Sequence, residues 1–135
     1  MPLSRMEHLL VLTDDLEATR DFYCEVLGLE AGERPPLEFP GYWLYLEGVP
    51  CVHVADREAY SAHAQTLGLA ASPPAEGSGA VDHIAFAATD YEEIAARLER
   101  HGVEAIENTI PAAGLRQLFV RDPNGVRVEI NVAVE

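Results

Sequence analysis

The chain has 135 residues, of which 48% are apolar and 24% are charged, and its formal net charge is −14 at pH 7. This length is enough for one domain with its own core, and the composition is that of an ordinary globular protein. The acidic charge argues against a nucleic-acid partner and against an anionic membrane surface, since both need a basic protein face. The first residues are too weakly apolar for a signal peptide or a membrane span, so we expect a cytoplasmic protein.

The first half of the chain predicts a strand, a helix and three further strands. A helical stripe of apolar residues marks the helix, and Gly28 fits the left-handed position that ends it. A loop with three prolines follows, because proline fixes φ and removes a hydrogen-bond donor. A weaker helix ends the half at Gly68. The expected ranges are the strands 5–12, 29–33, 42–46 and 51–55 and the helices 15–27 and 56–67.

The second half follows the same plan after a linker rich in proline, glycine and serine, which we place at 70–80. Its helix carries an apolar stripe and ends at Gly102, and its last two strands are joined by the strong turn sequence Asp-Pro-Asn-Gly. The expected strands are 80–87, 103–108, 115–121 and 126–132.

The two halves are an internal repeat. His83 lies 75 positions after His8, and each histidine follows an acidic residue at the start of a strand. The same shift relates two expected helix caps, Asp14 with Glu17 and Thr89 with Glu92. Half a chain of this size would leave one sheet face uncovered, so we expect both halves to form a single α+β domain over 1–135. Its modules would be 1–69 and 81–135.

Four side chains occupy related places in the repeat: His8, His53, His83 and Glu129. His53 follows His8 by 45 positions and Glu129 follows His83 by 46, each in the middle of the last strand of its half. Strand alternation puts the neighbouring valines on one face and these two donors on the other, where we expect the space between the halves. Three imidazoles and one carboxylate suit a divalent ion: Zn, Ni, Co, Mn or Fe.

Each of these residues also has an ordinary structural explanation. A single histidine in a strand is more often hydrogen-bonded within the fold than bound to metal, and a glutamate on an alternating strand is usually solvated. Their common placement in the repeat favours the metal site. His63 and His101 have no such support.

The chain resembles the vicinal oxygen chelate superfamily, which contains glyoxalases, bleomycin resistance proteins and extradiol dioxygenases. The residues that carry this resemblance are His8, the segments 12–23 and 26–29, and, in the second half, 82–86, 119–125 and 128–130. The resemblance implies two βαβββ modules in tandem, forming a curved eight-stranded mixed sheet around a central cleft. It also implies metal ligands at His8, His83 and Glu129, a further ligand at His53 in some branches, a small-molecule substrate and a homodimer.

In this superfamily the ion binds adjacent oxygens of a substrate and stabilises the charge that develops on them. With His53 as fourth ligand, two positions remain for a bidentate substrate, which favours a glyoxalase I-like lyase or isomerase with Glu129 assisting proton transfer. Arg116 and Gln117, and less strongly Arg20, are candidates to bind a substrate oxyanion.

Two alternatives stay open. Without His53, the remaining three ligands would suit Fe(II) in an extradiol-type, ring-cleaving dioxygenase, with three positions for substrate and O₂. The third hypothesis is a metal-free protein that binds and sequesters a drug, as bleomycin resistance proteins do. Such proteins tend to lack the ligands, so the complete set of four counts against it.

Overall fold

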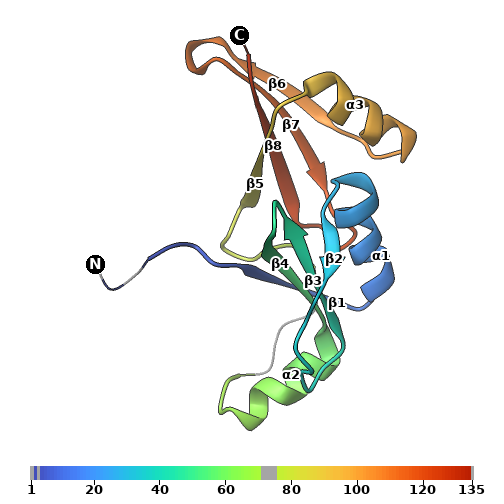
Figure 1. The fold of residues 1–135 in the computed structure, drawn as a ribbon, viewed down its shortest axis with the longest axis vertical. Helices are drawn as coiled ribbons and strands as arrows, with labels where there is room; N and C mark the ends of the chain where they lie inside the picture. Colours follow the sequence, from blue (N-terminus) through green and yellow to red (C-terminus); the bar gives the residue numbers. More distant parts are fainter. Residues whose placement is uncertain (1, 3, 71–75, 135) are drawn as a thin grey trace. The chain divides into compact units, whose positions relative to one another are not determined.

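The computed structural model describes residues 2, 4–70 and 76–134, and the chain divides into two compact units, 1–75 and 76–135. Each unit contains a four-stranded mixed sheet with helical segments (Figure 1). The α+β class and the repeated order of strand, helix and three strands are confirmed. Residues 71–75 of the expected linker lie outside the described residues. No helix in the described ranges is long and apolar enough to cross a membrane.

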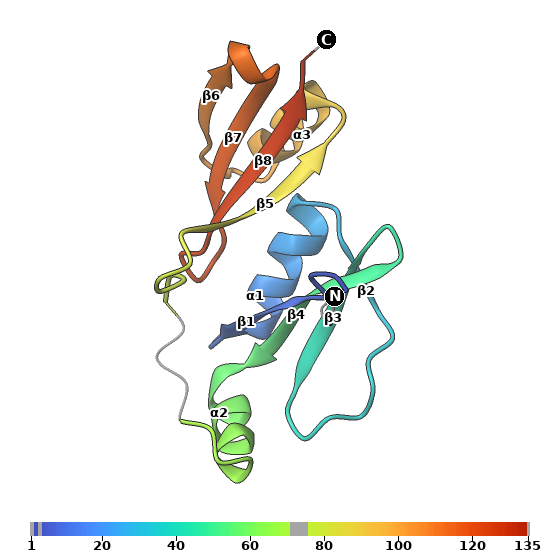
Figure 2. The same cartoon turned by 90° about the vertical axis from the view of Figure 1, so that its left-hand side faces the viewer.

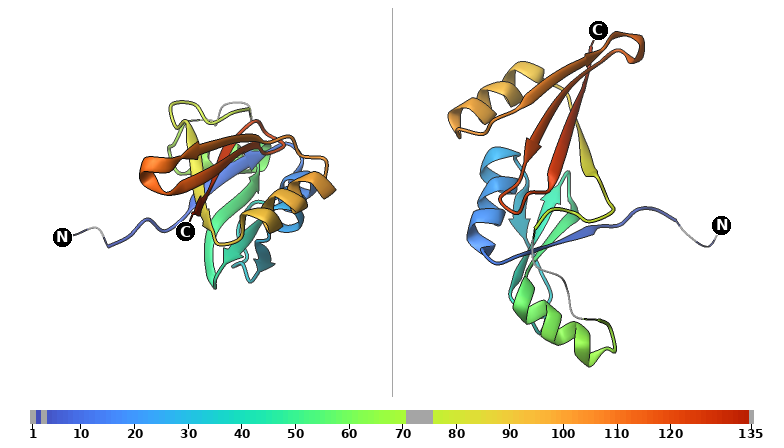
Figure 3. Two further views of the ribbon diagram at one scale, coloured as in Figure 1. Left: turned by 90° about the horizontal axis from the view of Figure 1, so that it is seen from above. Right: turned by 180° about the vertical axis from the view of Figure 1, so that it is seen from behind.

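Unit 1 has the strand order β1-β4-β3-β2, in which β1 and β4 are parallel and the other pairs are antiparallel. The α2 helix continues directly from the end of β4 (Figure 3). The elements are β1 (Leu9–Thr13), α1 (Leu16–Asp21), a π-helical turn (Phe22–Val26), β2 (Glu30–Gly32), β3 (Gly41–Leu46), β4 (Val49–Asp56) and α2 (Arg57–Thr66).

Unit 2 has the corresponding order β5-β8-β7-β6, again with only the first pair parallel (Figure 2). The matching order and strand directions show that the repeat in the sequence is a repeat of topology. The elements are β5 (His83–Ala88), α3 (Tyr91–Arg100), β6 (Ile106–Ile110), a short 3-10 turn (Pro111–Ala113), β7 (Leu115–Arg121) and β8 (Arg127–Ala133).

Alternating residues of the central strands form the core of each unit. Val52 and Val54 of β4 are each 1% exposed, and Val128, Ile130 and Val132 of β8 are buried in the same way. Burying an aliphatic side chain of this size contributes about 1.5–3 kcal/mol. Each row therefore holds its strand in one register, and the residues between them, including His53 and Glu129, lie on the opposite, partly exposed face.

Three strands begin at least three residues later than the sequence predicts, and one of them is β5, which begins at His83 rather than at residue 80. β1 begins at Leu9, where pairing with Val52 starts, so His8 lies just before the strand rather than inside it. β6 covers 106–110 rather than 103–108, because its pairing with β7 begins at Ile106.

Both helix caps lie one residue after the predicted ones. The carboxylate of Asp15 accepts from the Ala18 N–H at 3.1 Å, and that of Asp90 accepts from the Glu93 N–H at 3.1 Å. Asp14 instead pairs with Arg57 at 2.9 Å. The predicted Glu17 and Glu92 do not close capping boxes, since they bind Tyr42 and Arg116. The prediction was wrong by one residue at both helices because two residues able to cap a helix are adjacent there.

The first helix changes its pitch along its length. A continuous helix over 15–27 was predicted, but α1 gives way to a π-helical turn at Phe22. Gly28 follows Asp15 by 13 positions, whereas Gly102 follows Asp90 by 12, and both glycines have positive φ. The π turn accommodates the additional residue between the same cap and the same terminating glycine.

We expect the Asp90→Ala variant to lose about 1 kcal/mol of unfolding free energy, because an N–H at the start of α3 loses its acceptor. The exposed neighbour that the sequence favoured as the cap provides the control: Thr89→Ala should change stability by less than about 0.5 kcal/mol. Urea unfolding followed by circular dichroism measures both. A larger loss for Thr89→Ala than for Asp90→Ala would contradict the observed cap.

Candidate metal-binding residues

Two of the three histidines of unit 1, His8 and His53, lie against each other. The imidazoles of His8 and His53 are stacked, with ring centroids 3.8 Å apart and planes 11° apart. The indole of Trp43, the cross-strand partner of His53, stacks on the His53 ring at 4.3 Å. Burial, and next the neighbouring His8, lower the pKa of His53, which keeps its ring neutral and able to bind a cation.

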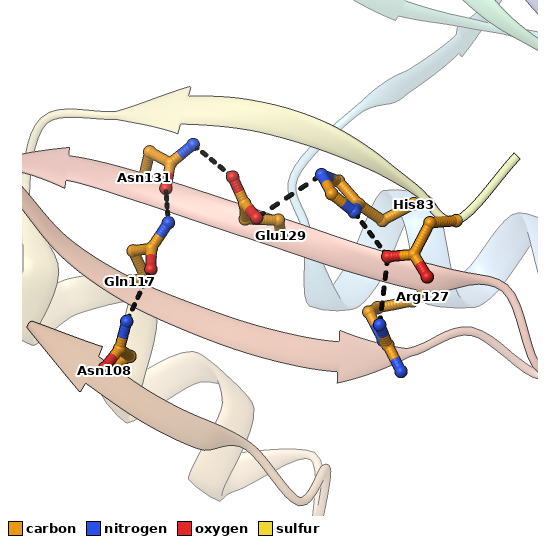
Figure 4. Close-up of polar contacts among 7 residues, drawn as sticks. His83, Asn108, Gln117, Arg127, Glu129 and Asn131 are labelled. Atoms are coloured by element: carbon orange, nitrogen blue, oxygen red, sulfur yellow. Dashed lines mark hydrogen bonds and ion pairs between the residues drawn. The ribbon is translucent and has the colours of Figure 1, made fainter.

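His83 and Glu129 of unit 2 also lie close together. His83 Nε2 lies 3.4 Å from Glu129 Oε1, across the pair formed by β5 and β8 (Figure 4). The Glu129 side chain is 14% exposed, so water screens its charge only in part. Each unit thus brings together the two donors that the repeat predicts for it.

An acidic residue orients the histidine that follows it in both units. His8 Nδ1 is 3.0 Å from Glu7 Oε1, and His83 Nδ1 is 2.8 Å from Asp82 Oδ2. If Nδ1 carries the proton and donates it to the carboxylate, Nε2 keeps its lone pair, the state required of a metal ligand. The hydrogen bond to His83 and the charge of Arg127, whose Nη1 is 3.0 Å away, hold the pKa of Asp82 below its ordinary value.

A chain of side-chain amides holds the other oxygen of Glu129. Asn131 Nδ2 donates to Glu129 Oε2 at 2.8 Å, Gln117 Nε2 donates to Asn131 Oδ1 at 3.0 Å, and Asn108 Nδ2 donates to Gln117 Oε1 at 2.8 Å. Figure 4 shows this chain crossing from β6 through β7 to β8. The amides fix the carboxylate so that Oε1 faces His83.

The structure distinguishes the three candidates for substrate binding. Gln117 lies on the Glu129 face of its sheet, and its amide is engaged by Asn108 and Asn131. Arg116, the next residue back along β7, points to the opposite face, where its guanidinium carbon lies 3.4 Å from the centroid of the Tyr91 ring. Arg20 pairs with Asp21 at 2.8 Å.

The donor atoms fit a divalent ion in chemistry, and in unit 2 also in spacing. Two ligands about 2.1 Å from a tetrahedral ion are separated by about 3.4 Å, the distance between His83 Nε2 and Glu129 Oε1. An imidazole binds an ion that lies in the plane of its ring. The two rings of unit 1 are nearly parallel, so one of them would have to rotate before both could bind the same ion. His8 precedes β1 and is the less constrained of the two. Within either unit, no three such side chains come together among the described residues.

Several supporting residues were not assigned a role from the sequence. Glu7 and Asp82 were noted as neighbours of histidines, but not as groups that fix a tautomer. Trp43 and Asn131 act across strands, and their partners depend on hairpin register. The alternation of Glu129 and Asn131 along β8 was the available signal for Asn131.

We expect the Gln117→Leu variant to lose about 1–3 kcal/mol of unfolding free energy. Gln117 is 8% exposed, so its loss leaves the amide oxygen of Asn131 without a donor in a site that water enters poorly. Asn108→Ala, at the exposed end of the chain of amides, should cost less, because water can replace its N–H. Urea unfolding measures both, and an equal or larger loss for Asn108→Ala would contradict the chain as described.

Comparisons with known proteins point to one family. The sequence profile of the Glyoxalase/Bleomycin resistance protein/Dioxygenase superfamily matches residues 5–130. The protein "Glyoxylase I 4" of Arabidopsis thaliana is 28% identical over 131 residues, which cover 95% of this chain and 70% of that protein.

Solved structures agree in fold. A putative glyoxalase family protein from Bacillus anthracis superposes with a TM-score of 0.73 at 20% identity, covering 97% of this chain and 96% of the other. A lactoylglutathione lyase from Agrobacterium tumefaciens gives 0.68 at 24% identity, covering 98% and 96%. Since the profile spans nearly the whole sequence, the chain belongs to the Glyoxalase/Bleomycin resistance protein/Dioxygenase superfamily.

Proposed function

We propose that this protein is a metal-dependent enzyme, a lyase or isomerase of the glyoxalase I kind, acting on a small oxygenated substrate. The observation that carries the proposal is the shared design of His8 and His83, each with Nδ1 beside the preceding carboxylate and Nε2 left for a ligand. The similarity to a protein named Glyoxylase I supports this choice within the superfamily. We also propose that the protein is cytoplasmic and that it forms a homodimer.

Four residues would hold one divalent ion, Zn, Ni, Co, Mn or Fe: His8, His53, His83 and Glu129. When bound, the ion supplies Lewis acidity that stabilises negative charge on substrate oxygens. Because these residues belong to both units, the proposal requires one ion to bind donors from each. We place the modules 1–69 and 81–135 in a single domain for the same reason.

Glu129 is the proposed proton acceptor. Asn131 occupies its Oε2, so Oε1 is the atom that would bind the ion, and it would have to leave the ion to take a proton from the substrate carbon and return it at the neighbouring position. The amides of Gln117 and Asn131 keep that oxygen in place. This assigns Gln117 to positioning Glu129, while Arg116, on the other face of β7, is left without a role in the reaction.

The dioxygenase is the second candidate, and the stacking of His53 favours it. The His53 ring lies between His8 and Trp43, which gives this histidine a structural role that needs no ion. In that case His8, His83 and Glu129 would form a set of two histidines and one carboxylate, with Fe(II) as the ion.

Metal analysis separates these proposals. Protein stripped with EDTA and reloaded should hold one ion per chain, and His83→Ala should weaken binding at least tenfold in calorimetry. If His53 is a ligand, His53→Ala should weaken it similarly, whereas His63→Ala and His101→Ala should not. Full retention by His53→Ala, with O₂ uptake on catechols after loading with Fe(II), would support the dioxygenase. Two independent ions per chain would contradict a shared site.

Activity tests the role of Glu129. We expect Glu129→Gln to lower turnover of a hemithioacetal of an α-oxoaldehyde at least a hundredfold, because an amide oxygen can accept the Asn131 N–H but not the substrate proton. Glu99→Gln, an exposed carboxylate on α3, is the matched control and should keep full activity. Equal activity in both variants, at equal metal content, would remove Glu129 from the proton transfer.

A further inference from the structure

Unit 1 contains a pocket of about 420 Å³ beside the stacked histidines. Its lining residues are Glu33, Arg34, Pro35, Trp43 and Tyr45, which come from the proline-containing loop after β2 and from β3. Volumes of about 300–1,000 Å³ are typical of small-molecule sites. The pocket shares Trp43 with the stack of His53 and His8, so a ligand here would lie next to a candidate metal ligand.

On β2 the cross-strand neighbour of Trp43 contributes no side chain. His53 of β4 covers the indole on one side, and the cross-strand partner on the other side is Gly32. A Cβ at Gly32 would come within 2.7 Å of the Tyr45 ring, so another residue there would require that ring to move. Trp43 and Tyr45 therefore line a pocket that can accept a flat group.

Arg34 contributes a positive charge to the pocket. It is half-buried, its Nη2 donates to the Phe39 carbonyl at 2.7 Å, and its guanidinium lies 5.3 Å from the centroid of the Phe39 ring. Burial lowers its pKa from the ordinary arginine value. These contacts hold the guanidinium in place while most of its N–H donors remain available.

Arg34 is not paired with a carboxylate among the described residues, although the chain is rich in carboxylates. The sequence has 23 acidic residues against nine basic ones, all of them arginine. Five arginines pair with carboxylates: Arg5, Arg20, Arg57, Arg116 and Arg127. Among the described residues, no carboxylate lies within ion-pair distance of Arg34, although Glu33 lines the same pocket. A partly desolvated guanidinium without a carboxylate is suited to bind one from a ligand.

We propose that this Arg34–Trp43 pocket binds a planar, conjugated carboxylate, with the carboxylate on Arg34 and the flat group along Trp43 and Tyr45. An aromatic carboxylate is the chemical class that satisfies both features. Its role as a substrate subsite beside His53 rests on the proposed function, whereas the binding itself requires no metal and no activity. Specificity for substrates carrying such a group would follow.

The pocket contains its own reporter, because Trp43 is the only tryptophan of the chain. EDTA-treated, full-length protein is titrated with benzoate, and tryptophan fluorescence is recorded. We expect a saturable change with benzoate, and at least tenfold weaker binding both of benzyl alcohol, which lacks the charge, and of cyclohexanecarboxylate, which lacks the planarity. Equal binding of all three compounds, or a linear response to benzoate, would overturn the proposal.

Substitutions of Arg34 test whether its guanidinium binds the carboxylate. Arg34→Gln should weaken benzoate binding at least tenfold, and Arg34→Lys should fall between it and the wild type, because lysine keeps the charge but not the planar fork. Arg100→Gln, an exposed arginine on α3, should bind like the wild type. Undiminished binding by folded Arg34→Gln would overturn the assignment. If that variant does not fold, the comparison of benzoate with benzyl alcohol on wild-type protein decides. If benzoate does not bind while metal binding persists, the proposed ligand of this pocket is wrong and the proposed function is unaffected.

Discussion

Burial of one face of each sheet is the constraint on which the candidate site depends. The aliphatic rows of β4 and β8 are removed from water, and a shift of one residue in either strand would expose the whole row. That cost fixes His53 and Glu129 on the opposite face without any contact of their own. The polar residues are thus positioned first by their apolar neighbours, and only then by hydrogen bonds.

The contacts that then hold the donor in place differ between the two units, because the two donors differ in charge. Glu129 is an anion, and it is held by an amide donor and the adjacent imidazole. His53 is a neutral ring, and it is held by aromatic stacking on both faces. An aromatic residue stands opposite the donor in each hairpin, Trp43 in unit 1 and Phe119 in unit 2. The two units therefore share their strand order but not the side-chain contacts that hold the donor.

The sequence was sufficient for the features that depend on periodicity and repetition. Strand alternation predicted the faces of His53 and Glu129, and the spacing of the halves predicted the pairing of donors within each unit. It was not sufficient where neighbouring residues compete for one role, as Thr89 and Asp90 do for a helix cap. Nor could it show contacts set by register between strands, such as those of Trp43 with His53 and of Gln117 with Asn131.

The π turn in the first helix bears on how the sequences of the two halves align with each other. Equivalent positions differ by 75 up to the caps Asp15 and Asp90, and by 74 at the glycines Gly28 and Gly102. The single-residue difference arises inside the helix, where the widened turn at 22–26 absorbs it, and not in a loop. An alignment of the two halves should open its first gap there, since a gap placed in the following loop would pair the wrong residues across the buried face of the helix.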